Sequence, residues 1–217
     1  MTAGPAELLA PRKAPAPPAP PAPAAHLAWQ RTDTVGTELV FPSRASAEGT
    51  AVIAGPVAYA SQWHADFDGT GAVRRLTVTC RGAQWARTLD LSREDDEWSC
   101  RTEETGDLAA HGRGGQPPPG IDDPLRLADA AVVRLGDSPA SLGWALRRLG
   151  LTPASGPVTV PTVRVLVPSL AVLPGVSTYQ MLGPHRLRVT GDDPACTYEV
   201  DDAGVVTYQP GRYRLVH

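Results

Sequence analysis

The sequence predicts a mainly β domain, in the form of a sandwich, barrel or half-barrel, with one short helix. Two observations support this prediction. From residue 26 onward the chain consists of about ten short apolar runs separated by Gly, Pro and Asp, which is typical of successive strands joined by turns. Only residues 138–149 repeat apolar side chains at the spacing of a helix instead.

Two hairpins are the clearest elements of the predicted sheet. Residues 76–80 (LTVTC) and 85–91 (WARTLDL) alternate with period two, and residues 81–84 (RGAQ) between them predict a tight turn. The second hairpin is predicted at residues 195–208, where the DDAG sequence supplies residues that tolerate positive φ. By contrast, residues 103–119 contain clusters of Gly and Pro and predict a long loop.

The predicted helix carries signals at both of its ends. Ser138 is the candidate N-cap, and Pro139 suits the first helical position because an N–H there would be unpaired anyway. Gly150 is expected to end the helix. The expected buried stripe consists of Leu142, Ala145, Leu146 and Leu149.

The first 25 residues differ in composition from the remainder. They are rich in Ala and Pro, which predicts an extended, flexible tail ahead of a single domain at residues 26–217. No signal peptide and no apolar run of about 20 residues is visible, so the expected location is the cytoplasm. The formal net charge of -3 gives no electrostatic reason to expect nucleic acid or an anionic membrane as a partner.

The sequence carries no recognisable catalytic or metal-binding motif. The patterns GxSxG, GxxxxGK[ST] and HExxH are absent, and the five histidines are scattered without metal-ligand spacing. Cys80, Cys100 and Cys196 form no CxxC pair and lie in apolar runs, which predicts free thiols. We therefore expect no cofactor and no bound metal.

One arginine is predicted on an apolar strand face. Arg87 shares its face with Trp85 and Leu89, and a buried charge without a partner is costly. Its partner is either an internal carboxylate, or a phosphate or carboxylate group of a ligand held bidentately. The internal candidates are Asp66, Asp201 and Glu38.

Several stretches resemble one known family. Residues 200–214 (VDDAGVVTYQPGRYR) resemble a terminal hairpin in which Val-Asp, Gly-Val, Tyr-x-Pro and a closing Arg recur. Residues 168–182 (PSLAVLPGVSTYQML) resemble a Pro-x-Leu strand followed by Tyr, and residues 76–91 resemble a strand pair with a Trp and a following Arg. From about Ala28 to the C-terminus, the chain is therefore similar to the putative glycolipid-binding family, a group of bacterial proteins.

The helical motif of that family is only partly matched. Pro139 and the Arg147–Leu149 sequence agree with it. Leu142 stands at its asparagine position, Ala145 at its proline position, and Arg134 at the position of an upstream aspartate.

The resemblance implies a curved antiparallel sheet, half-barrel or barrel-like, that encloses an apolar cavity beside the helix. The implied function is non-enzymatic binding of an amphipathic ligand, such as a glycolipid or fatty-acyl compound. The apolar chain of this ligand would lie on apolar strand faces, and Arg87, Arg147 or Arg148 would hold its polar head group. The expected ligand-binding residues are Trp63, Trp85, Arg87, Trp98, Arg147, Arg148, Tyr179 and Tyr208.

Two other functions stay open at this point. A metal-dependent phosphate-ester or nucleotide hydrolase on a similar barrel would need clustered carboxylates, for which Asp66, Asp201 and Glu38 are the candidates. A non-catalytic structural or interaction module would use the Pro-rich tail as its contact, for example as a PxxP ligand.

Overall fold

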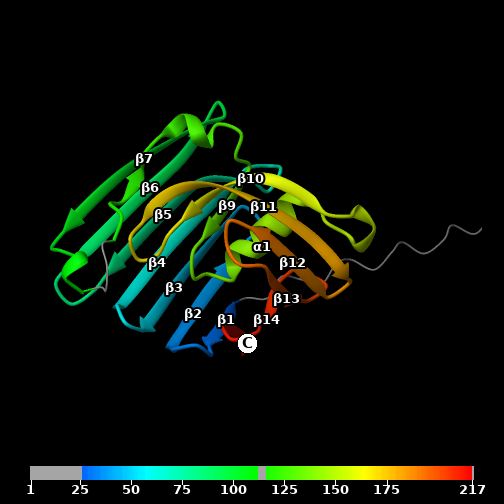
Figure 1. Cartoon of the computed structure of the whole chain (residues 1–217), viewed down its shortest axis with the longest axis horizontal. Helices are drawn as coiled ribbons and strands as arrows, with labels where there is room; N and C mark the ends of the chain where they lie inside the picture. Colours follow the sequence, from blue (N-terminus) through cyan, green and yellow to red (C-terminus); the bar gives the residue numbers. More distant parts are fainter. Residues whose placement is uncertain (1–25, 112–115, 217) are drawn as a thin grey trace, which may run out of the picture.

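A computed structural model describes residues 26–111 and 116–216 of the chain. The predicted tail at residues 1–25 and residues 112–115 of the predicted loop lie outside the described residues. The described part forms a single curved sheet of 15 strands that does not close on itself, with one α-helix (Figure 1). This arrangement confirms the mainly β fold with one helix that the sequence predicts.

The first half of the sheet is an antiparallel meander of seven strands in chain order. Its inward-facing residues alternate with exposed ones, because successive side chains on a strand point to opposite faces. The predicted strand pair at residues 76–91 is present, and both of its apolar faces are buried as expected. The strands are β1 (Leu27–Arg31), β2 (Val35–Pro42), β3 (Ser46–Ala54), β4 (Ala58–Phe67), β5 (Val73–Arg81), β6 (Ala86–Glu94) and β7 (Glu97–Thr105).

Tryptophans fill the concave side of this first half. Trp29, Trp63, Trp85 and Trp98 are each less than 5% exposed and belong to one large apolar cluster. The Trp63 ring lies directly over Gly49 of the neighbouring strand, where a Cβ atom would be only 2.4 Å from the ring. The interior of this half is therefore occupied by the protein's own side chains.

The second half of the sheet is smaller and more tightly curved around the helix (Figure 1). Its long central strands pair antiparallel, whereas β9 pairs parallel to β10 at the sheet edge. Its elements are β8 (Gly120–Ile121), β9 (Val132–Leu135), α1 (Ala140–Leu149), β10 (Val158–Val165), β11 (Ala171–Gly183), β12 (Arg186–Gly191), β13 (Cys196–Val200), β14 (Val206–Gln209) and β15 (Tyr213–Leu215). Short 3₁₀ turns lie at Ala109–His111, Pro124–Leu127 and Pro153–Ser155.

The strands β9, β10 and β11 contribute buried side chains to two separate cores. On one side, residues such as Val133 and Val163 pack into the tryptophan-filled core of the first half. On the other side, Val132 and Tyr179 pack with Leu142 and Ala145 of α1 in a second core. These strands therefore form a shared layer between the two cores.

The helix begins one residue later than its sequence signals predict. Pro139, not Ser138, is the N-cap, and its backbone already has helical angles of φ -65° and ψ -25°. Ser138 makes no capping bond, because its buried hydroxyl is directed into the interior beside Glu38. The predicted end is confirmed, since Gly150 has φ 55° and its N–H donates to the Leu146 carbonyl.

The predicted loop at residues 103–119 begins later than expected. Residues 103–105 continue β7, because they pair with residues 86–88 of β6. The hairpin predicted at residues 195–208 is confirmed as β13 and β14.

Strands from opposite ends of the described chain meet in the middle of the sheet. β1 pairs antiparallel with β15 through three residue pairs, from Trp29–Leu215 to Arg31–Tyr213. This short seam joins the two halves. Among the described helical segments, none combines the length and apolarity needed to cross a membrane.

Candidate functional site

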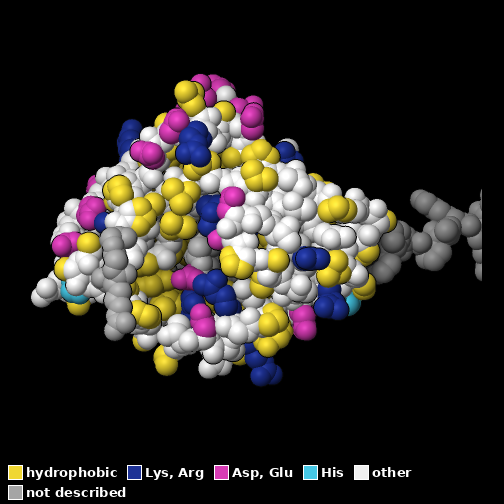
Figure 2. Space-filling view, in the orientation of Figure 1, with side chains coloured by type: hydrophobic (Ala, Val, Ile, Leu, Met, Phe, Trp, Pro, Cys, Tyr) yellow, Lys and Arg dark blue, Asp and Glu magenta, His cyan; other side chains and the backbone are white. Residues whose placement is uncertain are grey.

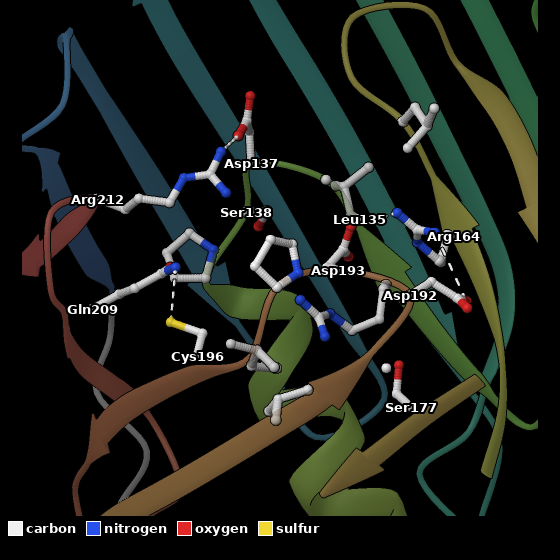
Figure 3. A pocket seen from close by; sticks show the side chains of 18 of the residues that line it. Leu135, Asp137, Ser138, Arg164, Ser177, Asp192, Asp193, Cys196, Gln209 and Arg212 are labelled. Atoms are coloured by element: carbon white, nitrogen blue, oxygen red, sulfur yellow. Dashed lines mark hydrogen bonds and ion pairs between the residues drawn. The ribbon is translucent and has the colours of Figure 1, made fainter. Parts of the chain in front are cut away.

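A cavity of about 580 Å³ opens in the second half of the sheet. It lies between the start of α1, the ends of β9 and β10, the segment 189–196 that joins β12 to β13, and residues 209–213 (Figure 3). In the face shown in Figure 2, acidic and basic side chains gather around a hollowed area. The volume of the cavity is in the range of pockets that hold small molecules.

The walls of the cavity combine apolar and charged groups. Leu166, Val167 and Pro194 supply apolar surface that is partly or fully exposed, and Pro139 and Leu142 of the helix form a buried apolar floor. The charged lining residues are Arg134, Arg164 and Arg212 with Asp137, Asp192 and Asp193. The cavity therefore has the mixed character that an amphipathic molecule requires.

Two of these arginines are neighbours across the sheet. Arg134 on β9 and Arg164 on β10 are direct partners in the parallel register, and both line the cavity. Arg164 Nη2 contacts Asp193 Oδ1 at 2.6 Å, and its Nη1 lies 3.8 Å from Asp192 Oδ2. Its charge is thus neutralised by two carboxylates on an exposed loop.

Arg134 has no such carboxylate partner within the described part of the chain. The residue is half-buried, but its Nε is fully buried and has no hydrogen-bond acceptor among the described residues. Burial acts to lower the pKa of Arg134, but the adjacent Tyr179 and Tyr198 hydroxyls and the charge of Asp193 outweigh it, so the pKa is raised. Arg134 is therefore a permanent positive charge whose closest supporting groups are two tyrosine hydroxyls.

Tyr179 and Tyr198 are the two tyrosines beside Arg134. Burial raises the pKa of Tyr198 to about 12, while Arg134 acts in the opposite direction. The Tyr179 hydroxyl is fully buried without a well-formed hydrogen bond. Both hydroxyls lie beside Arg134 and are able to donate a hydrogen bond.

The opposite end of the cavity is built around Asp137. Its carboxylate accepts from Arg212 at 2.6 Å, lies 3.3 Å from Arg31, and is 3.4 Å from the hydroxyls of Tyr59 and Tyr213. Asp137 has a positive φ of 59°, a strained conformation for a residue with a side chain. These contacts tie the β9–α1 turn to β1, β4 and β15. Figure 3 shows Arg212 with Asp137 on one side of the cavity and Arg164 with the acidic loop on the other.

Glu38 lies beneath this end, inside the first half of the sheet. Burial raises the pKa of Glu38 to about 7, and the Asp137 charge acts in the same direction, whereas Ser138, Trp63 and Arg31 oppose it. Trp63 donates to Glu38 Oε1 at 2.9 Å, while Oε2 has no partner among the described residues. Glu38 is therefore a buried acid that titrates near neutral pH.

The structure distributes the eight predicted ligand-binding residues over several regions. Trp63, Trp85 and Trp98 are buried in the first core, and Tyr179 is buried in the second. Tyr208 is half-buried on β14. None of the eight lines the 580 Å³ cavity, although Tyr179 lies directly behind it beside Arg134. Their assignment to a ligand site stays a prediction.

The three predicted arginines have different surroundings. Arg87 is buried, and its guanidinium donates to the carbonyls of Pro117 and Ser169 at 2.9 Å each and to Glu104 at 2.8 Å. The internal partners expected from the sequence, Asp66, Asp201 and Glu38, were the wrong ones, because β7 places Glu104 directly opposite Arg87. Arg147 and Arg148 are exposed on α1, and Arg147 lies over the Phe67 ring.

The carboxylates considered for a metal do not come together. Across residues 26–111 and 116–216, no group of three His, Cys, Asp or Glu side chains could hold an ion. Glu38 is buried in β2, while Asp66 is bonded to His64 and Asp201 caps the β13–β14 turn. The three cysteines are free, as predicted, but only Cys80 is fully buried.

Four lining residues of the cavity are not among the residues that the sequence predicts for a site: Arg134, Arg164, Asp137 and Tyr198. The signal for Arg134 was weak because β9 is buried on both faces, so its sequence VVRL shows no alternation. Asp137 follows a strand and precedes a helix, and its position in that turn was the only indication available.

Comparison with known proteins supports the fold. A search of curated proteins gave no match. The crystal structure of a DUF1089 family protein from Pseudomonas aeruginosa is similar, with a TM-score of 0.66 and 14% sequence identity over 82% of this chain and 91% of that chain. At this identity the likeness concerns the fold alone. A family model described as "Putative glycolipid-binding" matches residues 26–214, and the chain therefore belongs to this family.

Proposed function

We propose that this chain is a non-catalytic binding protein for an amphipathic small molecule, with glycolipids as the class that the family description suggests. One observation carries the proposal: a single 580 Å³ cavity presents an apolar wall and a row of guanidinium groups. A ligand with an alkyl part and a polar head would match both.

The cavity differs from the sequence expectation in its lining. The resemblance implies an apolar cavity that the curved sheet encloses beside the helix, whereas tryptophans and leucines occupy the interior of the first half. The 580 Å³ cavity lies beside the start of α1, and its walls are partly polar. In this arrangement the head of the ligand contacts Arg134 and Arg164, and its alkyl part contacts Leu166, Val167 and Pro194.

The apolar contacts contribute most of the binding free energy in this proposal. Apolar surface removed from water contributes about 25 cal/mol per Å², so an alkyl chain needs only a few contact residues to bind measurably. The guanidinium groups orient the head, because charged hydrogen bonds depend on direction.

The test compares two variants on adjacent residues of β11. Ser177 lines the cavity and is 8% exposed, whereas Val176 points to the opposite face and is 49% exposed. The wild-type protein, stripped of bound lipid and incubated with a lipid extract, is expected to retain an amphiphile in native mass spectrometry. Ser177→Phe should fill the cavity and abolish retention, while the matched control Val176→Phe should retain it. Retention by neither wild type nor control, or equal retention by both variants, would count against the proposal.

A further inference from the structure

We infer that the end of the cavity at Arg134 is a subsite for a tetrahedral oxyanion, such as the phosphoryl group of a phosphate ester or phospholipid head. This inference rests on the proposed function, because it names the chemical group that the polar part of the cavity takes. It is carried by the arginine pair and by the unused hydrogen-bonding groups around it.

The first step is the placement of like charges side by side. Arg134 and Arg164 are cross-strand partners on the cavity side of the sheet, and neighbouring strands lie about 4.8 Å apart. Like charges directly opposite each other destabilise a sheet. An anion between the two guanidinium groups would convert this repulsion into attraction.

The second step is that one member of the pair is not neutralised. Arg164 has ion pairs with two carboxylates, whereas Arg134 has no ion pair among the described residues, and its Nε is buried without an acceptor. Tyr179 likewise has a buried hydroxyl without a well-formed bond. Leaving a buried charge or donor unpaired is costly, so a ligand oxygen at this point would satisfy several groups at once.

The donor set suits three oxygens better than two. Arg134, Arg164 and Tyr198 reach the cavity from three different strands, β9, β10 and β13. A carboxylate offers two coplanar oxygens, whereas a phosphoryl group offers three that point in different directions and match arginine forks well.

The Asp192–Asp193 loop acts as an internal competitor for this subsite. Asp193 is exposed but already holds Arg164 at 2.6 Å, and Asp192 is fixed by the Val176 N–H at 3.0 Å. Gly175 leaves room for this contact, because a Cβ atom there would lie 2.6 Å from Arg164 Cδ and 2.7 Å from Asp192 Oδ2. A bound phosphoryl group would therefore displace the carboxylate of Asp193 from Arg164.

The experiment titrates the lipid-stripped protein with inorganic phosphate by calorimetry. Arg134→Gln is expected to weaken binding by about 10-fold or more, because it removes charge-assisted hydrogen bonds to the anion. Arg188→Gln, an exposed arginine on the outer face of β12, is the matched control and should bind like wild type. Asp193→Asn should bind phosphate several-fold more tightly, and this opposite sign keeps the test valid if Arg134→Gln folds poorly.

Two further ligands are tested. One distinguishes a lipid head from a free phosphate ester as the source of the phosphoryl group, and the other separates the oxyanion subsite from the proposed function. Dihexanoyl phosphatidic acid should compete with phosphate; a much tighter affinity than phosphate indicates a lipid head, and a similar affinity indicates a free phosphate ester. Octyl glucoside, a neutral amphiphile, should bind wild type and Arg134→Gln equally. Absence of phosphate binding to both wild type and Asp193→Asn overturns the oxyanion subsite, while retained octyl glucoside binding would leave the proposed function intact.

Discussion

An inward-facing arginine lies in each half of the sheet, Arg87 in the first and Arg134 in the second, but the two have different surroundings. Arg87 in the first half donates to two carbonyls and one carboxylate, in a core filled with tryptophans. Arg134 in the second half lies at a cavity with no carboxylate partner in the described chain. Arg87 uses its hydrogen bonds within the fold, whereas the charge of Arg134 is available to a ligand in the cavity. The contrast shows that burial alone does not identify a binding residue; the deciding property is whether the protein satisfies the charge by itself.

Removal of a tryptophan from the filled half should have the largest effect. Trp63→Ala should lower the free energy of unfolding by about 3–5 kcal/mol, because it opens a large cavity and leaves Glu38 without its donor. Phe41→Ala, on the exposed outer face, is the matched control and should cost far less. Urea denaturation measures both. Similar losses in the two variants would show that the interior of the first half is not the main source of stability.

Arg87 should behave as a structural residue. Arg87→Met should lower the free energy of unfolding by about 2–4 kcal/mol, because the buried Ser169 carbonyl and the part-buried Pro117 carbonyl lose their donor. Arg81→Met, an exposed arginine at the end of β5, serves as control. An unchanged denaturation midpoint for Arg87→Met would contradict the contrast between the halves.

Glu38 should make the stability of the protein depend on pH near neutrality. Its pKa is about 7 when folded and close to 4.5 in an unfolded chain, so between these values the folded state holds a proton that the unfolded state has released. Stability should therefore fall as pH rises through this window and level off above about pH 7. Glu38→Gln should remove most of this slope and stabilise the protein by about 1–3 kcal/mol at pH 8. Denaturation at pH 5 and pH 8 tests it, with the exposed Glu48→Gln as control; parallel pH profiles for wild type and Glu38→Gln would contradict it.

Arg134 should contribute least to stability. Arg134→Met replaces a half-buried charge that has no ion pair among the described residues by an apolar side chain of similar length, so the free energy of unfolding should change by less than about 1 kcal/mol, or rise. The same variant should lose phosphate binding. A loss of stability as large as that of Arg87→Met would show that Arg134 is structural as well.

The fold and the inward-facing position of Arg87 could be predicted from the sequence, but the cavity lined by Arg134 could not. Alternation placed Arg87 correctly on an apolar face, because its strand has one buried side. Its partners could not be predicted, since Pro117 and Ser169 come from distant segments that only the folded sheet brings together. Arg134 was recognised only as a departure from a family motif. Arg134 matters because it has no ion pair among the described residues. Which carboxylates lie near it depends on how distant segments fold together, and the spacing of residues along the chain does not show this.

The seam between β1 and β15 determines how the molecule would respond to tension. Trp29 pairs with Leu215, so both ends of the described chain leave the sheet on the same side. Force that separates these ends would load the seam's hydrogen bonds one after another rather than together, because they run across the strands. The seam would therefore peel apart under low force, starting at the Trp29–Leu215 pair, and the peeling would reach the cavity when Tyr213, which borders it, separates from Arg31.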